Sequence, residues 1–423
     1  MLFAATSKSF KENSKVVELL FIKIKNELFN RITSVIDFLF FYLKLHSVKP
    51  YSFPGNQLGI IYLGENLPPR IARMYKWLKR KYAINGVLVC AQNGYNSKFV
   101  EMEFDSVYLF RNKWHLYGIL QKINGANLIH AFGPKSYYPD MARQFMPLTK
   151  FVYDMQDVLG IYFGLNTDIR WFQKEFPHEK NCLQFADGLV SHGLEPIPAY
   201  RVYGIKEKRN RLFFPLFCDD DRFCDNVHKL SDGFHVVYAG EIQNSNRDKK
   251  QFGNIQFDDL IDELSHQKIH FHVYPSPSTN PLLYNQYLEV ANTNPYFHLE
   301  KSVAQSELSK ELSKYHYGII PFFKSTSGQS NDKYKYSTAL KLFNFIEAGI
   351  PTICSEDIEF QAWILKRNYA GFSISQEDVK TLGAKLNSID YTAIQRNLIR
   401  NRPRLSLANN IHSLYKFYNR ILQ

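Results

Sequence analysis

Apolar and polar residues alternate in short blocks from Leu58 onward. Residues 58–81, LGIIYLGENLPPRIARMYKWLKRK, begin with an apolar run typical of a buried strand and turn at Gly64. After Pro68 and Pro69 the apolar residues recur at helical spacing. Further short apolar runs each end in polar or turn residues: GVLVCAQ, SVYLF, ANLIHAFGP and KFVYDMQD. Because helical stretches separate several of these runs, the pattern predicts a doubly wound α/β sheet with parallel strands.

The same pattern restarts after a linker-like passage, NRLFFPLFCDDDRF. FHVVYAGEI and IHFHVYPSPST are typical of strands, and ELSKELSKYHYGIIPF is typical of a helix followed by a strand. No sequence repeat relates the two halves, yet both predict open α/β sheets of similar size. We therefore expect two facing Rossmann-like domains, residues 51–215 and 216–400, with a final helical segment over residues 401–423.

Residues 1–50 differ in character from the rest. They mix apolar and basic residues at helical spacing, and their longest charge-poor run, near residues 38–43, is far shorter than the roughly 20 residues that span a bilayer. The first thirty residues also lack the apolar core and cleavage site of a secretory signal. The pattern predicts a helical appendage that either lies on a membrane surface or packs on the body of the protein.

Composition narrows the class of partner. The formal net charge of +12 implies anionic partners, which include nucleic acid, phosphate-bearing ligands and acidic membrane surfaces. The five cysteines form no CxxC pair and no Cys/His cluster at zinc spacing, so we expect buried thiols in a reducing, cytoplasmic compartment and no metal site. No GxGxxG follows a strand, which disfavours a hydride-transferring enzyme.

One polar file interrupts an otherwise apolar helix. In STALKLFNFIEAGIPTIC, residues 337–354, the polar residues Lys341, Asn344 and Glu347 are three apart and fall on one side of the helix. The file is either a solvated face or the floor of a ligand site.

The order of elements and several motifs resemble the GT-B glycosyltransferases, and most closely glycosyltransferase family 4 (group 1) and its relatives. KLFNFIEAGIP is similar to the donor-binding helix K-L-F-E-Y-x-x-A-G-x-P of that family, VVYAGEI to the opening strand of its second domain, and NLIHAFGP to a His-containing strand end of its first. The resemblance runs from about residue 58 to residue 422. It implies a GT-B fold, with the terminal helix crossing back onto the first domain.

The resemblance also implies a donor site at the amino end of this helix, where a nucleotide-sugar pyrophosphate would bind. The implied donor-binding residues are Gly240, Ser337, Thr338, Lys341, Asn344 and Glu347. Asn344 stands where the family has a ribose-binding Glu, and Glu347 is the carboxylate that we expect to replace it. Glu241 stands where the family has Arg, so Arg247, Lys249 and Lys250 are the nearest bases that could neutralise the diphosphate.

The first domain supplies candidates at the carboxyl ends of its predicted strands, where such sheets bind ligands. His130 and Asp157 are the candidate catalytic residues, and Gly64 is the candidate acceptor-binding residue. A structural hydrogen-bonding role is equally open for both catalytic candidates. Phe132 and Gln156 stand where many relatives carry His. Without a metal or cofactor, backbone dipoles and basic side chains would have to stabilise the departing diphosphate.

The resemblance implies a hexosyltransferase-type enzyme. We expect it to move a sugar from a nucleotide-diphosphate sugar to a lipid-linked or polysaccharide acceptor, in the synthesis of cell-surface glycans such as lipopolysaccharide. We expect a peripheral enzyme on the cytoplasmic face of an anionic membrane, with no nucleic-acid partner. A nucleotide-sugar epimerase of the same fold and a basic, non-catalytic binding protein are the alternatives.

Overall fold

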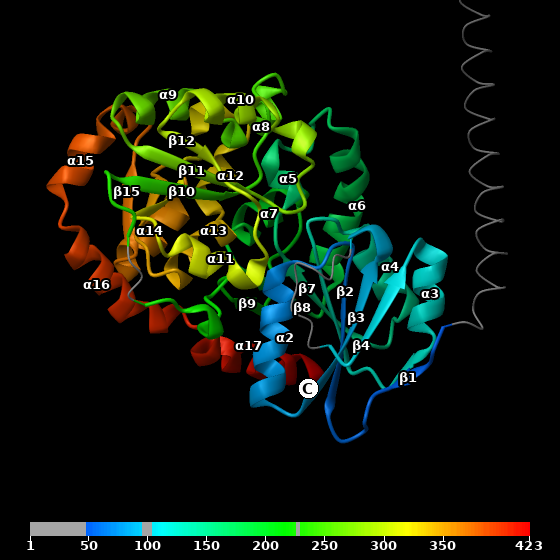
Figure 1. Cartoon of the computed structure of the whole chain (residues 1–423). Helices are drawn as coiled ribbons and strands as arrows, with labels where there is room; N and C mark the ends of the chain where they lie inside the picture. The colour runs from blue at the N-terminus through cyan, green and yellow to red at the C-terminus, as the bar shows by residue number, and fades with distance from the viewer. Residues whose placement is uncertain (1–47, 95–103, 226–228) are drawn as a thin grey trace, which may run out of the picture.

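The computed structural model describes residues 48–94, 104–225 and 229–423. Two α/β domains lie side by side, and the C-terminal end of the chain returns to the first of them (Figure 1). The predicted appendage, residues 1–50, lies almost wholly outside the described residues. Within the described ranges, no helix combines the length and the apolar character needed to cross a bilayer.

The first domain is built on a seven-stranded parallel sheet in the order β4-β3-β2-β6-β7-β8-β9. Its strands are β2 (Leu58–Gly64), β3 (Ile84–Ala91), β4 (Ser106–Phe110), β6 (Leu128–Gly133), β7 (Lys150–Met155), β8 (Gly188–Ser191) and β9 (Arg211–Phe213). Its helices are α2 (Pro69–Lys81), α3 (Lys113–Leu120), α4 (Tyr137–Phe145), α5 (Leu159–Tyr162), α6 (Arg170–Phe185) and α7 (Pro196–Tyr203). A separate parallel pair is formed by β1 (Tyr51–Ser52) and β5 (Ile123–Asn124).

The second domain has a six-stranded parallel sheet in the order β12-β11-β10-β13-β14-β15. Its strands are β10 (His235–Gly240), β11 (His270–Pro275), β12 (Phe297–Leu299), β13 (Tyr317–Ile320), β14 (Thr352–Ser355) and β15 (Gly371–Ile374). Its helices are α8 (Lys249–Phe252), α9 (Asp258–His266), α10 (Gln286–Thr293), α11 (Gln305–Leu312), α12 (Asn331–Tyr336), α13 (Leu340–Glu347), α14 (Glu359–Asn368), α15 (Leu382–Ser388) and α16 (Tyr391–Asn401).

Each sheet is covered by an apolar cluster on both faces. Because both faces are buried, the strands consist of continuous apolar runs in the sequence. In the first domain, one cluster joins the sheet to α3–α7 and the other joins it to α2 and the C-terminal helix. The α/β architecture with parallel sheets, which the apolar pattern predicts, is thus confirmed.

The C-terminal helix α17 (Leu407–Leu422) lies on the first domain, against α2 (Figure 1). Its six buried residues are Leu407, Ile411, Leu414, Phe417, Tyr418 and Ile421. They pack into the same cluster as Ile60 of β2 and Val190 of β8. Gly188 makes room for the helix, because a Cβ there would lie 2.7 Å from the Phe417 ring.

Two chain segments cross between the domains next to each other. Cys218, in the first crossing, donates its N–H to the Leu405 carbonyl at 2.7 Å and accepts from the Leu407 N–H at 2.8 Å in the second. The adjacent Asp219 is tied to α2, where Lys76 Nζ lies 2.5 Å from its carboxylate. The two crossings therefore form one short parallel bridge beside the first domain.

Candidate functional site

A cavity of about 860 Å³ opens between the two domains. The first domain contributes residues that follow β7 and β8, including Asp157 and His192, and the start of α6 at Trp171. The second domain contributes Gly240 at the end of β10, the end of β11, and residues of α12 and α13. The carboxyl ends of both parallel sheets thus face one space, which is where open α/β sheets bind ligands.

The amino end of α13 borders this cavity without a side-chain cap. Its N-cap residue, Ala339, offers no side-chain acceptor, and the Ala339 N–H itself donates to Gln361 Oε1 at 2.9 Å. Ser337 and Thr338 line the cavity, and the buried Thr338 hydroxyl has no hydrogen-bond partner within the part of the chain that the structure describes. The helix dipole and the Thr338 hydroxyl are therefore free to meet an anion in the cavity.

Lys341, in the first turn of α13, lies across the end of β10. Gly240 has a φ of 154°, and a Cβ at that position would lie 2.3 Å from Lys341 Cε. Glycine is thus required both by the backbone and by the approach of the lysine. Lys341 Nζ lies 5.1 Å from the ring centroid of Tyr238 and 5.2 Å from that of Phe322, within cation–π range.

Among the described residues, Lys341 has no hydrogen-bond or ion-pair partner. Burial lowers the pKa of Lys341 from its ordinary value, although Glu241 opposes the shift. The cavity therefore holds a partly buried cation whose charge is not neutralised by any carboxylate of the described chain. An anionic ligand would supply that charge.

Asn344 lies one turn beyond Lys341 and also lines the cavity. Its Oδ1 accepts a hydrogen bond from Gln305 Nε2 at 3.3 Å. The two neighbouring amides can both donate and accept hydrogen bonds, as recognition of a hydroxyl-bearing ligand requires.

Glu347, the third residue of the polar file, does not line the cavity. Its carboxylate is fully buried and accepts from Arg73 Nη1 at 2.8 Å, the Asp219 N–H at 2.8 Å and Ser309 Oγ at 2.9 Å. Each three-residue step turns a helix by about 300°, so the third residue of the file is about 120° from the first. The expected donor contact of Glu347 is replaced by an ion pair that joins α13 to α2.

Asp157 lines the cavity but is already paired. Lys333 Nζ of α12 lies 2.6 Å from Asp157 Oδ1 and 2.7 Å from Glu195 Oε1, and Tyr162 donates its hydroxyl to Asp157 at 2.9 Å. Burial opposes ionisation of Asp157, but Lys333 outweighs it and holds the pKa of this carboxyl below its usual range. Asp157 is therefore an ionised member of an ion cluster between the domains, not a free base.

Glu195 is the second carboxylate on the same ammonium group. One lysine neutralises only one carboxylate, so burial raises the pKa of Glu195 to about 7 despite the nearby Lys333. The group formed by Asp157, Glu195 and Lys333 is called the interdomain triad below.

His130 and Gly64 lie apart from the cavity, contrary to the expectation from strand ends. His130 is fully buried, with Nδ1 2.7 Å from the Tyr418 hydroxyl of α17 and Nε2 3.3 Å from Asp154 Oδ2. Gly64 is buried against Phe132, whose ring atom Cε2 would lie 2.3 Å from a Cβ at position 64. Both residues serve packing of the first domain.

His192 is a cavity residue that the sequence interpretation missed. It directly follows β8, and its buried Nδ1 has no hydrogen-bond partner in residues 48–94, 104–225 and 229–423. Burial, assisted by the charge of Arg70, lowers the pKa of His192 to about 4, so its imidazole is neutral near pH 7. The strand-end reasoning that selected His130 applies equally to the motif GLVSHG.

The loop after β10 supplies little positive charge to the cavity. Glu241 lines it, whereas Arg247, Lys249 and Lys250 do not. Arg247 instead lies over the Phe252 ring at 4.9 Å. Lys341 is consequently the cation best placed for a ligand at the amino end of α13.

Comparison with known proteins agrees with this geometry. Residues 251–413 match the glucosyltransferase 3-like, C-terminal domain family. No curated protein sequence matches the chain.

Solved structures share the whole fold at low sequence identity. Sucrose-phosphate synthase from Thermosynechococcus elongatus is 12% identical with a TM-score of 0.62, over 85% of this chain and 98% of that one. HepE from Anabaena, solved with UDP-glucose, is 11% identical with a TM-score of 0.56, over 86% of this chain and 98% of that one. An alpha-glucosyltransferase, solved with UDP-glucose and DNA, is 8% identical with a TM-score of 0.58, over 86% of this chain and 99% of that one. The chain therefore has the fold of these GT-B glycosyltransferases, and over residues 251–413 it is similar to the C-terminal domain of the glucosyltransferase 3-like family.

Proposed function

We propose that the protein transfers a hexosyl group from a nucleoside diphosphate sugar to a glycan acceptor. The observation that carries this proposal is the amino end of α13, where an uncapped helix end, an unpaired Thr338 hydroxyl and an unpaired Lys341 border one cavity. A diphosphate matches this set of donors in charge and in hydrogen bonding. UDP-glucose bound to HepE and to the alpha-glucosyltransferase, which share the fold, supports a uridine diphosphate sugar as the donor.

The same groups would act in the transfer step. When the bond between the anomeric carbon and the diphosphate oxygen breaks, negative charge grows on the departing diphosphate. Lys341 and the α13 dipole are fixed in place before the reaction, so they stabilise that charge without reorganisation. We propose that transfer needs neither Mg²⁺ nor Mn²⁺, because these fixed groups take the role of the cation.

Asn344 and Gln305 are the proposed contacts for the nucleoside. They line the cavity next to Lys341, and their side-chain amides can exchange hydrogen bonds with ribose hydroxyls. Asn344 offers an uncharged hydrogen bond where the resemblance implies a carboxylate, so we expect the ribose contact to be weaker than a charge-assisted one.

The first-domain wall is the proposed acceptor side. Trp171 lines the cavity with 45% of its surface exposed, and Phe163 lies on the same wall. Such an aromatic rim suits the apolar face of a sugar or the start of a lipid carrier. His192, with a neutral and unpaired ring nitrogen, is the proposed hydrogen-bond partner of a sugar hydroxyl.

We further propose a lipid-linked or polysaccharide acceptor at the cytoplasmic face of a membrane, in cell-surface glycan synthesis. The support is the basic and aromatic composition of residues 1–50, which suits an in-plane membrane helix. Deletion of these residues should abolish sedimentation of the protein with anionic vesicles. A truncated chain that folds and binds vesicles as well as the full chain would rule out this anchor.

A screen of UDP, GDP and ADP by thermal denaturation tests the donor. A nucleotide that binds only the folded chain raises the melting temperature by mass action, and we expect UDP to give the largest rise. Incubation with the matching nucleotide-sugar should then release the nucleotide slowly, and faster with acceptor. If no nucleoside diphosphate shifts the melting temperature, the donor site is not at α13; if the donor is epimerised instead, the protein is an isomerase.

A further inference from the structure

Five histidines gather at the amino ends of neighbouring strands in the second domain. They are His235 at the start of β10, His270 and His272 in β11, His298 in β12, and His316 just before β13. The parallel register places His235 opposite His270 and His272 opposite His298. The imidazoles therefore stand on one face of the sheet. This edge is about 17 Å along β10 from the cavity at Gly240.

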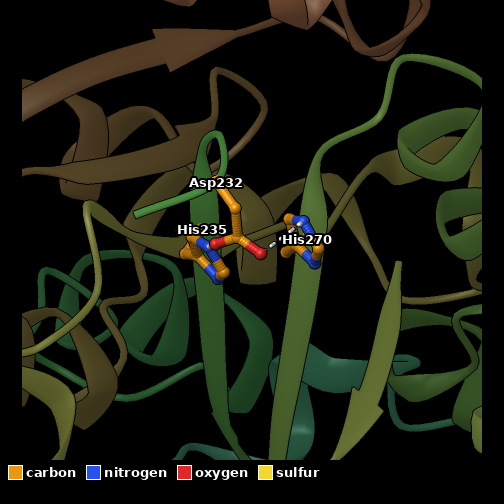
Figure 2. Close-up of side chains that lie close together, drawn as sticks. All are labelled: Asp232, His235 and His270. Atoms are coloured by element: carbon orange, nitrogen blue, oxygen red, sulfur yellow. Dashed lines mark hydrogen bonds and ion pairs between the residues drawn. The ribbon is translucent and has the colours of Figure 1, made fainter. Parts of the chain in front are cut away.

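Asp232, in the segment before β10, brings a carboxylate to this cluster. Its Oδ1 lies 2.9 Å from His235 Nε2, and its Oδ2 lies 3.8 Å from His270 Nε2. Figure 2 shows the carboxylate between the two imidazole rings. One ligand atom from each of the three residues lies within 4.8 Å of the others.

The hydrogen-bond chain behind His235 fixes where its proton resides. Glu300 Oε1 lies 2.8 Å from His272 Nδ1, and a carboxylate can only accept, so His272 Nδ1 carries the proton. The other ring nitrogen of a neutral His272, Nε2, is then an acceptor, and it lies 2.9 Å from His235 Nδ1, which donates to it.

With Nδ1 donating to His272, the Nε2 of His235 faces the Asp232 carboxylate at 2.9 Å. A lone pair on this Nε2 and the carboxylate oxygen would share a cation held between them. His270 has a similar placement: its Nδ1 is 3.0 Å from His298 Nε2, and its Nε2 faces the other oxygen of Asp232 at 3.8 Å. The cluster is thus complementary to a positive ion.

We propose that Asp232, His235 and His270 bind a divalent transition metal of the Zn²⁺ class. The protein ligands are the Asp232 carboxylate and the Nε2 atoms of both histidines, with water completing the shell. Two imidazoles and one carboxylate are ligands that Zn²⁺ accepts. His272, Glu300 and His298 hold the opposite ring nitrogens, which is the usual way of orienting metal-bound histidines.

Metal binding would change the orientation of the His235 and His270 rings. The two rings are nearly parallel, with centroids 4.4 Å apart and planes at 9°, whereas a nitrogen lone pair lies in its ring plane. A shared ion therefore tilts both rings toward Asp232. Since the site is at the opposite end of β10 from Gly240, the metal ties the segment before β10 to the sheet and takes no part in sugar transfer.

Titration of the full-length protein with CoCl₂ and ZnCl₂ tests this site. We expect visible Co²⁺ absorption that saturates at one ion per chain, and a rise in melting temperature with ZnCl₂. Asp232→Asn and His270→Gln should weaken binding of either metal by about 10–100-fold. Asp232 is 70% exposed, and Asn tolerates its positive φ of 87°, so the first variant should fold normally. His266→Gln, at an exposed position on α9, is the matched control and should bind as the wild type does.

Two results would overturn the site. One is the absence of both Co²⁺ absorption and a Zn²⁺-dependent thermal shift in the wild type. The other is equal metal affinity in the wild type, Asp232→Asn and His270→Gln, which would assign the binding to scattered surface groups. UDP binding, measured on the same samples, should be the same in both variants as in the wild type, so the result is independent of the donor site.

Discussion

Two lysines near the cavity, Lys333 and Lys341, differ in how their charge is balanced. Lys333 is held between two carboxylates, Asp157 and Glu195. Lys341 lies over aromatic rings with no carboxylate in contact among the described residues. A buried cation without a partner costs stability in the unliganded protein. That cost is relieved when an anion binds, so Lys341 is suited to ligand binding and Lys333 to structure.

Replacement of Lys341 by Ala should therefore weaken UDP binding by about 1–3 kcal/mol, the usual loss for a charge-assisted contact. The free energy of unfolding without ligand should stay the same or rise, because an uncompensated charge is removed. Isothermal titration calorimetry with UDP measures the first quantity. Lys335→Ala, at an exposed position on α12, is the matched control. Equal UDP affinity in both variants would remove Lys341 from the diphosphate site.

Sequence reasoning selected residues that the structure brings to the cavity where their placement depends on local structure. Gly240, Lys341 and Asn344 all line the cavity, as the resemblance of the KLFNFIEAGIP helix implied. Glu347 and His130 could not be placed in this way, because their partners Arg73 and Tyr418 are 274 and 288 residues away in the sequence. The proposed metal ligands could not be predicted from the sequence for a related reason. They come from two strands and a preceding loop, not from one short motif.

At the level of secondary structure, α17 shows how a distant element completes the first domain. Helical spacing of its apolar residues predicts the helix, but periodicity alone does not say which domain it covers. The buried hydroxyl of Tyr418 meets His130 of β6, and Gly188 of β8 leaves space for Phe417. The helix thus fills a place on the first sheet that no earlier part of the described chain covers.

Replacement of Leu414 by Ala should lower the free energy of unfolding by about 2–5 kcal/mol, because this fully buried side chain would leave a cavity between α17 and the first sheet. Urea denaturation followed by circular dichroism measures the change. Ser413→Ala, on the exposed side of the same helix, should change stability by less than about 0.5 kcal/mol. If the two variants are equally stable, α17 does not support the domain.

At the level of the whole molecule, the two domains are held together by buried charges on both sides of α13. The Arg73–Glu347 pair joins α2 to the end of α13, and the interdomain triad joins α12 to the first domain. Strand positions and the two-domain organisation could be inferred from apolar periodicity. These interdomain contacts could not, because their energies depend on which charges become buried together.

The triad makes stability depend on pH. The pKa of Glu195 is raised to about 7 in the folded chain and is about 4.3 when unfolded, so over this window the folded state holds a proton that the unfolded state has released. The resulting stabilisation is complete below about pH 4.3 and is lost as the pH rises through about 7.

Glu195→Gln cannot titrate, so its free energy of unfolding should decline less than that of the wild type between about pH 5 and pH 8. We expect the difference to be roughly 1–3 kcal/mol. Chemical denaturation at several pH values measures both profiles. Glu359→Gln, at an exposed position on α14, should follow the wild type. Parallel profiles for the wild type and Glu195→Gln would show that this carboxyl titrates normally.

The paired crossings at Cys218 and Leu405–Leu407 have a mechanical consequence. The two chain segments that connect the domains run side by side and are joined by hydrogen bonds of 2.7 and 2.8 Å, so they form a hinge between the domains. Such a joint leaves one easy rotation and resists sliding or twisting of one domain over the other. We therefore predict that any opening of the domains separates Lys333 from Asp157 and Glu195 while the Cys218 bridge stays intact. A joint of this kind would return Lys341 and His192 to the same separation on closing.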